Sequence, residues 1–297
     1  MTIAKNATVF RTDGLTKELL LQAITAKPFS NCAPTDAESS GFVPIAKGSD
    51  QMLYSVGDIH GFTLRHDVKI LPGAVVKEAA RQRADEIEEE QGRKVGRKEL
   101  AEIKETIYLQ LLQVAFVKIT HIRGWYDAVG NLLVIDASSP TKVDMVLHHL
   151  MKGMPESADG KIVLSKLNDT CGAGECFNRW IAISEAPDNF SLDDRATFSD
   201  HKGGKATITN TSVLEAEVKK LSEGRYCTEL ALTHNGKISF TLTDRLILKS
   251  ISLVGIDQEQ ALNQGDMLAE ELAAAELTVT AGLIRGAAQA IVAVMAG

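Results

Sequence analysis

The sequence lacks the features of an exported or membrane-embedded chain. Residues 1–12 contain Lys5 and Arg11 and no apolar segment, so no signal peptide is expected. Only four cysteines are present and they are scattered, which excludes a disulfide-built secreted scaffold and predicts reduced thiols. The most apolar stretch, AAQAIVAVMAG at the end, is too short to cross a bilayer. These absences predict a soluble cytoplasmic protein without a membrane partner.

The chain also lacks a net positive charge. Its 32 Lys and Arg residues stand against 39 Asp and Glu residues, which gives a formal net charge of −7 at pH 7. This balance excludes a uniformly basic nucleic-acid-binding surface. A local basic patch remains open, because binding responds to the field near the contact. The 297 residues are 44% hydrophobic and 24% charged, which is ordinary for a globular protein with a sizeable core.

No catalytic signature is complete. The sequence contains no phosphate-binding P-loop, dinucleotide fingerprint or nucleophile turn. The stretch GDIHG at 57–61 is similar to the start of a two-metal phosphoesterase site, with Asp58 and His60 as ligands. Such a site also needs an Asn-His pair, but here Asn131 is followed by Leu132. A turn between two strands explains the motif more simply.

Two cysteines could form half of a zinc site. Cys171 and Cys176 flank a glycine-rich stretch, but no second pair of Cys or His lies nearby in the sequence. Two small residues in a loop are the simpler interpretation. We therefore predict no catalytic residue, no metal site and no cofactor.

Hydrophobic periodicity predicts strands and helices without a regular strand–helix–strand rhythm. Strands are expected at 7–11, 52–57, 61–68, 115–123, 131–137, 226–233 and 237–243, the last two joined by an Asn235-Gly236 turn. Helices are expected at 16–24, 139–153, 213–223 and 258–295, and loops at 31–50 and 155–178. The pattern favours an α+β fold with mixed antiparallel sheets.

Residues 73–115 change in character and become rich in Glu, Lys, Arg and Ala. Apolar residues recur at helical spacing on both sides of QGRKVG at 91–96, whose two glycines interrupt the pattern. The segment therefore predicts two antiparallel helices joined by a short turn, forming a charged helical arm.

Basic residues of this arm lie on its first helix and, most densely, at its joint. Lys77 and Arg81 share one face of the first helix, because they lie four residues apart. This basic surface is a candidate for contacts to phosphates. The alternative is a solvated helical hairpin, since charge runs of this kind are usual on exposed helices. Within the joint itself, four cations fall within six residues: Arg93, Lys94, Arg97 and Lys98.

Several segments, in this order and spacing, resemble the recombination-associated RdgC family. They are KNATVFR at 5–11, VKILP at 68–72, the charged arm, LLQVAF at 111–116, WYDAVGNLLVIDA at 125–137 and GRYCTELAL at 224–232. The resemblance covers nearly the whole of residues 1–297 and is loosest over 155–212. It implies a central α+β part of residues 1–72 with 112–154, a helical arm at 73–111 and a C-terminal α+β part at 155–297.

The resemblance also implies a function. Members of the family are homodimers that close into a ring around double-stranded DNA, with little sequence preference and without hydrolysis, and so restrain RecA-type recombinases. For this chain it implies a nucleoid-associated protein and an aromatic subunit contact at Phe116, for which a core position is the alternative. The expected phosphate contacts are Lys77, Arg81, Arg93, Lys94, Arg97, Lys98, Lys118 and Arg123.

One segment departs from the family pattern. Clustered lysines are expected before residue 213, but this chain reads ATITNTSVLEAEV at 206–218. No DNA contact is therefore assigned to Thr209 or Asn210, and a second contact region would be weaker or displaced towards His201, Lys202 and Lys205. Two other functions remain open. One is a protein-interaction inhibitor of the recombinase, and the other is the metal-dependent phosphoesterase suggested by GDIHG.

Overall fold

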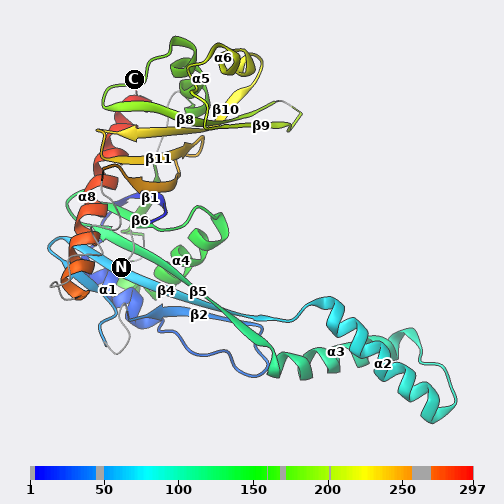
Figure 1. The fold of residues 1–297 in the computed structure, drawn as a ribbon. Coiled ribbons are helices and arrows are strands. Elements are labelled where there is room, and N and C mark those ends of the chain that lie inside the picture. Colours follow the sequence, from blue (N-terminus) through cyan, green and yellow to red (C-terminus); the bar gives the residue numbers. More distant parts are fainter. Residues whose placement is uncertain are drawn as a thin grey trace. The chain divides into compact units, whose positions relative to one another are not determined.

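The computed structural model of the chain describes residues 4–44, 50–158, 160–167, 172–200, 202–255 and 269–296. The chain divides into two compact units. The sheet unit comprises Met1–Ala26, Pro44–Phe62 and Arg123–Gly297, and the arm unit comprises Lys27–Val43 and Thr63–Ile122. Each unit combines helices with antiparallel strands, so the predicted α+β class is confirmed (Figure 1).

The strands of the described residues form one 12-stranded sheet with antiparallel pairings. Its order is β2-β4-β5-β6-β1-β12-β11-β10-β8-β9, with β3 beside β4 and β7 beside β1. β4 and β5 pass from one unit into the other. The strands are β1 (Asn6–Asp13), β2 (Glu38–Val43), β3 (Tyr54–Val56), β4 (Ile59–Ile70), β5 (Phe116–Asp127), β6 (Leu132–Ile135), β7 (Val163–Lys166), β8 (Phe190–Ser199), β9 (Lys205–Thr209), β10 (Tyr226–His234), β11 (Ile238–Thr243) and β12 (Leu248–Leu253).

The helices fall into both units. The arm unit contains α2 and α3, and the sheet unit contains the others. The helices are α1 (Lys17–Ala26), α2 (Gly73–Gln91), α3 (Arg97–Val114), α4 (Pro140–Gly153), α5 (Ala173–Ile183), α6 (Ala216–Ser222) and α8 (Ala269–Ala296), with a 3-10 turn, η1 (Glu156–Ala158).

The core of the sheet unit lies on one face of β8, β10, β11 and β12. Alternate side chains of a strand point to the same face, and the register pairs Leu230 with Leu242 and Leu232 with Phe240. All four side chains are almost completely buried. Helices α5 and α8 cover this face and contribute to the same cluster Phe177, Ile181, Ile284 and Ile291.

Helix α8 is long and apolar. Its stretch Ala274–Met295 has the length and composition of a membrane span, so the expectation that this region is too short was wrong. Its buried residues recur every three or four positions, which is typical of a helix packed on a core. They include Leu277, Ala281, Ile284, Ala288, Ile291 and Met295, which join the cluster formed by β10 and β11.

The arm unit contains the two predicted arm helices, which lie side by side (Figure 1). α2 ends at Gly92, whose φ of 61° suits glycine and whose N–H donates to the oxygen of Glu88. α3 begins after Gly96, so the predicted joint at 91–96 is confirmed. The Glu88 carboxylate also accepts the N–H of Val95 at 2.8 Å, which holds the turn.

Two local signals from the sequence are confirmed. The Oγ1 of Thr16 accepts the N–H of Leu19 at 3.3 Å, as a residue that caps α1 should. The Asn235-Gly236 turn joins β10 to β11, with positive φ values of 51° and 63°. This pair of left-handed residues fits the tight hairpin turn that the Asn-Gly sequence favours.

Two stretches predicted as loops contain regular structure. Residues 31–50 include β2, which pairs with β4 from Glu38 opposite Val68 to Val43 opposite Thr63. Residues 155–178 include η1, β7 and the start of α5. The helix predicted from residue 213 begins at Ala216 instead, and the Oγ of Ser212 accepts the N–H of Leu214.

The cysteines differ from the expectation of reduced thiols. Cys176 is disulfide-bonded, so the expectation was wrong there, and its sulfur is not available as a thiolate ligand for zinc. Cys171, the other half of the suggested zinc pair, lies outside the described residues. Cys32 and Cys227 are free. Burial of Cys227 raises the pKa of its thiol to about 12.

Candidate nucleic-acid interface

Five of the predicted phosphate-contacting residues are exposed cations on the arm. Lys77 and Arg81 lie one turn apart on α2, Lys94 lies in the joint, and Arg97 and Lys98 begin α3. None of the five forms an ion pair with another described residue. Long cationic side chains without a carboxylate partner are free to bind phosphate oxygens.

Arg93 is already engaged. Its guanidinium donates to both carboxylate oxygens of Glu99 at 2.7 Å, and its Nε donates to Gln91 at 2.8 Å. The pair raises the pKa of Arg93 and lowers the pKa of Glu99, mainly through these hydrogen bonds. Exposed pairs contribute little stability, so Arg93 could exchange Glu99 for a phosphate, but in this structure it braces the joint.

Arg123 has a structural position. It is half-buried, and its Nη2 donates to the Asp136 carboxylate at 3.4 Å. The other oxygen of Asp136 accepts the backbone N–H groups of Lys5 and Asn6 at 3.2 and 3.0 Å. Arg123 therefore belongs to a polar junction between β5, β6 and β1 of the sheet unit. Lys118, the remaining predicted contact, is exposed on β5 in the arm unit.

The arm as a whole is not basic. Residues 73–114 contain nine acidic and eight basic side chains. Charge is therefore separated only locally, with cations at the joint and, as Lys77 and Arg81, on one face of α2, while Arg83 pairs with Glu86. Only these local groups of cations could attract a polyanion, because the net charge of the whole arm is close to zero.

Phe116 lies at the start of β5 and is 85% exposed. A position in the core of its own chain, the alternative left by the sequence, is therefore excluded. Val114, Val117 and Ile119 around it are also exposed. We call Val114, Phe116, Val117 and Ile119 the β5 patch. A run of exposed large apolar residues marks an interaction surface more often than a solvated one.

The second region considered from the sequence forms the β8–β9 hairpin of the sheet unit. The Asp200 carboxylate accepts the N–H groups of Lys202 and Gly204 at 2.9 and 2.7 Å, which closes the turn. Lys202 and Lys205 are exposed there. His201 lies outside the described residues. Thr209 and Asn210 are exposed, and Asn210 adopts a left-handed φ of 58°.

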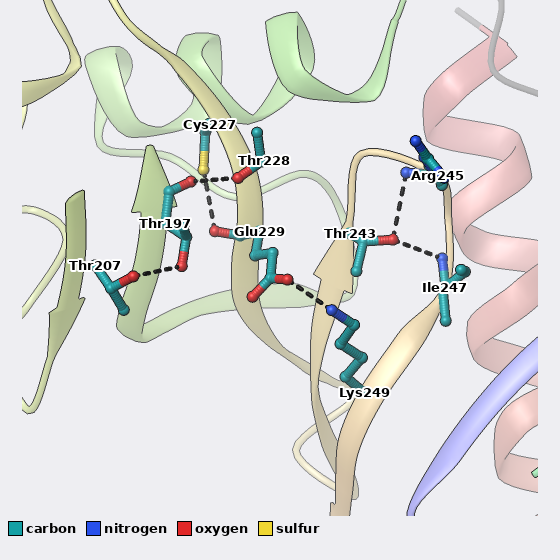
Figure 2. Close-up of polar contacts among 9 residues, drawn as sticks. All are labelled: Thr197, Thr207, Cys227, Thr228, Glu229, Thr243, Arg245, Ile247 and Lys249. Carbon is teal, nitrogen blue, oxygen red and sulfur yellow. Dashed lines mark hydrogen bonds and ion pairs between the residues drawn. The ribbon is translucent and has the colours of Figure 1, made fainter. Parts of the chain in front are cut away.

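Sequence reasoning missed several polar contacts along β8, β9, β10, β11 and β12 (Figure 2). Lys249 of β12 donates to Glu229 of β10 at 2.7 Å, and Thr197 and Thr207 share a hydrogen bond of 3.2 Å. The Oγ1 of Thr243 accepts two backbone N–H groups of the β11–β12 turn. No sequence signal reveals such cross-strand pairs, because they depend on register.

The GDIHG motif is a hairpin turn. Gly57, with a φ of 55°, and Asp58 connect β3 to β4. The His60 ring is buried, its Nδ1 lies 3.0 Å from Ser55 Oγ, and burial lowers its pKa. Asp58 is exposed, and its backbone oxygen accepts the N–H of Ala128. Among the described residues, no three His, Cys, Asp or Glu side chains are grouped to hold a metal ion.

Comparison with known proteins gives a consistent result. A family model described as "RdgC: Putative exonuclease, RdgC" matches residues 3–297. The recombination-associated protein RdgC of Herminiimonas arsenicoxydans is 32% identical over 262 residues, which cover 86% of this chain and 85% of that protein. The proteins of the same name from Cupriavidus pinatubonensis and Bordetella pertussis are 34% and 35% identical. They cover 81% and 69% of this chain, and 79% and 68% of their own lengths.

Proposed function

Because this chain belongs to the family of recombination-associated RdgC proteins, we propose that it binds double-stranded DNA without sequence preference. The observation that carries the proposal is the set of exposed arm cations that form no ion pair within the described part of the chain. Lys77, Arg81, Lys94, Arg97 and Lys98 provide it, and Lys118 of β5 adds a further exposed cation in the same unit. Arg93 binds DNA only when a phosphate replaces Glu99 as its partner. Arg123 contributes less to DNA binding, because its guanidinium is paired with Asp136.

These cations bind phosphate oxygens and read no bases. Each neutralised phosphate releases counterions, so affinity falls steeply as salt rises. The expected Kd is that of non-specific binding, on the order of 10⁻⁴–10⁻⁶ M at physiological salt before any gain from dimer formation. The net charge of −7 limits adhesion elsewhere on the molecule.

The proposed active form is a homodimer. The β5 patch, with Phe116 at its centre, provides a subunit contact, because burying exposed aromatic and aliphatic side chains drives association. Two subunits that close into a ring would retain duplex DNA by topology as well as by charge. Such a protein, in the cytoplasm and associated with the nucleoid, would restrain a RecA-type recombinase by occupying its DNA.

We infer that the chain acts on DNA without cleaving it. The described residues offer no grouped metal ligands, and the GDIHG side chains serve a hairpin. To test this inference directly, end-labelled linear duplex DNA is incubated with the protein and Mg²⁺ or Mn²⁺. Full-length DNA after prolonged incubation supports the inference, and shortened products that disappear with Asp58→Asn would establish the phosphoesterase instead.

The binding proposal is tested by two variants of equal charge change. One replaces Lys77, Arg81, Lys94, Arg97 and Lys98 with Gln, and its control replaces the exposed Lys142, Lys152, Lys161, Lys220 and Lys237 of the sheet unit with Gln. The arm variant should bind random duplex at least roughly tenfold more weakly than the control at equal salt. Equal losses would show that the arm is an ordinary solvated surface.

A further inference from the structure

The arm has a second surface that differs from its cationic one. A groove of about 260 Å³ runs between α2 and α3. Its floor is apolar, formed by Ile87 of α2 with Ile103 and Ile107 of α3. The rest of its lining is polar or charged: Arg83, Glu99, Glu102, Thr106 and Gln110. The three isoleucines are only partly buried, so the two helices leave apolar area between them in contact with solvent.

The groove and the charged residues next to it together have an excess of negative charge. Arg83 pairs with Glu86 at 2.7 Å, and Arg93 pairs with Glu99, so these four charges cancel. Glu102 remains without an ion pair in the described residues, and so does Glu90, which lies one turn beyond Glu86 on α2. Carboxylates around an apolar floor attract a cationic partner and repel nucleic acid.

The groove and the cationic surface occupy different sides of α2. At about 100° per residue, Arg83 at the groove lies roughly 200° around the helix from Arg81. On α2, DNA bound along Lys77 and Arg81 therefore lies on the side away from the groove. Because this surface combines carboxylates with apolar side chains, it favours a partner other than DNA.

We propose that this groove binds a basic amphipathic helix of a partner protein. Apolar side chains at positions i, i+3 or i+4, and i+7 of such a helix would pack on Ile87, Ile103 and Ile107. Its lysines or arginines would reach Glu102 in the groove lining and Glu90, three residues beyond Ile87 on α2, where carboxylates without an ion pair among the described residues gain a counter-charge. The inference goes beyond DNA binding and does not depend on it.

A second copy of this chain is a poorer occupant. In a twofold contact the same surface meets itself, so the acidic edges of two grooves would face each other. Like charges brought together oppose such a dimer. A contact between the groove and the cationic side of another copy would be head-to-tail, and repeated contacts of that kind lead to open filaments.

The test uses fluorescence anisotropy with a labelled leucine–lysine amphipathic peptide of about 14 residues, or roughly four turns. The full chain should bind it more tightly than a leucine–glutamate peptide of the same pattern. Glu90→Lys with Glu102→Lys should weaken binding by roughly tenfold or more. The control, Glu78→Lys with Glu89→Lys, makes the same charge change on exposed positions of α2 away from the groove and should change affinity less than about twofold.

An equal loss in both double variants would overturn the proposal, because the peptide would then be sensing overall charge. Unchanged binding in the groove variant would also overturn it. A change in sedimentation of the groove variant without peptide would assign the groove to a second copy. Ile107→Ala should weaken peptide binding several-fold, and circular dichroism should show that the arm helices are intact. Peptide binding by a chain that ignores duplex DNA would defeat the proposed function and leave this inference intact.

Discussion

The two arm helices and α8 show opposite uses of helical sequence. α8 has one basic residue, Arg285, between Leu277 and Met295, and its buried stripe joins the core of the sheet unit. In α2 and α3, only Val76, Ala80, Ala84 and Leu112 are buried, and nearly half of the other residues are charged. The arm therefore depends on local devices, such as the Gly92 turn and the Glu88 and Arg93 hydrogen bonds.

This difference separates stability from recognition. Residues of the sheet unit are constrained by packing, so changes there should cost free energy of unfolding. Exposed residues of the arm contribute little to folding, so changes there should alter binding while the chain stays folded. Four predictions test how sharply the molecule follows this division.

The largest effect is expected for a buried aromatic side chain. Phe198 of β8 is fully buried in the core of the sheet unit. Phe198→Ala should lower the free energy of unfolding by about 3–5 kcal/mol, because it removes packing and leaves a cavity. Urea denaturation followed by circular dichroism measures this change.

The matched control is the exposed phenylalanine of the arm unit. Phe116→Ala should change the free energy of unfolding of the monomer by less than about 0.5 kcal/mol. It should instead weaken self-association in sedimentation experiments, because the β5 patch loses its largest side chain. If Phe116→Ala greatly lowered monomer stability and left self-association unchanged, the separation of stability from binding would not hold for Phe116.

Two glycines give the next comparison. A Cβ on Gly153, at the end of α4, would collide with the backbone oxygen of Ala23 in α1. Gly153→Ala should therefore destabilise the sheet unit by about 1–3 kcal/mol. Gly73→Ala at the start of α2 meets no atom within 4 Å, so it should be neutral or stabilise by up to about 1 kcal/mol. In thermal unfolding experiments, the unfolding midpoint of Gly153→Ala should fall, whereas that of Gly73→Ala should stay the same or rise.

Acidification should act on the sheet unit through its buried histidines. Burial lowers the pKa of His60 and of His234 below the ordinary value of 6.5. The unfolded chain then binds protons that the folded chain refuses, so stability should fall as pH drops below about 6.5 and stay level above pH 7. Residues 73–114 contain no histidine. The double variant His60→Gln with His234→Gln should flatten the pH dependence of the urea unfolding midpoint. If the variant keeps the same pH profile, the pH dependence of stability comes from other groups.

The smallest effect concerns thiol reactivity. Cys32 of the arm unit is half-buried, whereas Cys227 of β10 is buried and has a thiol pKa of about 12. At pH 8 very little Cys227 is thiolate, so a thiol reagent should modify Cys32 first and Cys227 only on unfolding. Cys32→Ser should remove the fast phase. Rapid modification of Cys227 in the folded protein would show that the β10 region opens easily.

Local patterns predicted the arm, the α1 cap and the Asn-Gly hairpin, because each depends on residues near one another in the chain. β2 was missed because ESSGFV has no clear alternation and is a strand only through pairing with β4. The arm cations were identified from sequence, but the engagement of Arg93 by Glu99 and of Arg123 by Asp136 was not. Those contacts depend on how the chain folds back on itself, which no spacing rule gives.

The central claim is that exposed arm cations bind DNA through phosphates. Its most direct test measures the binding constant for random-sequence duplex across a range of salt concentrations. The comparison is between the unaltered chain and the variant with Gln at positions 77, 81, 94, 97 and 98. The account predicts that the slope of log K against log salt becomes shallower by about 0.9 for each phosphate that the variant no longer neutralises. Parallel slopes for the two proteins would contradict it.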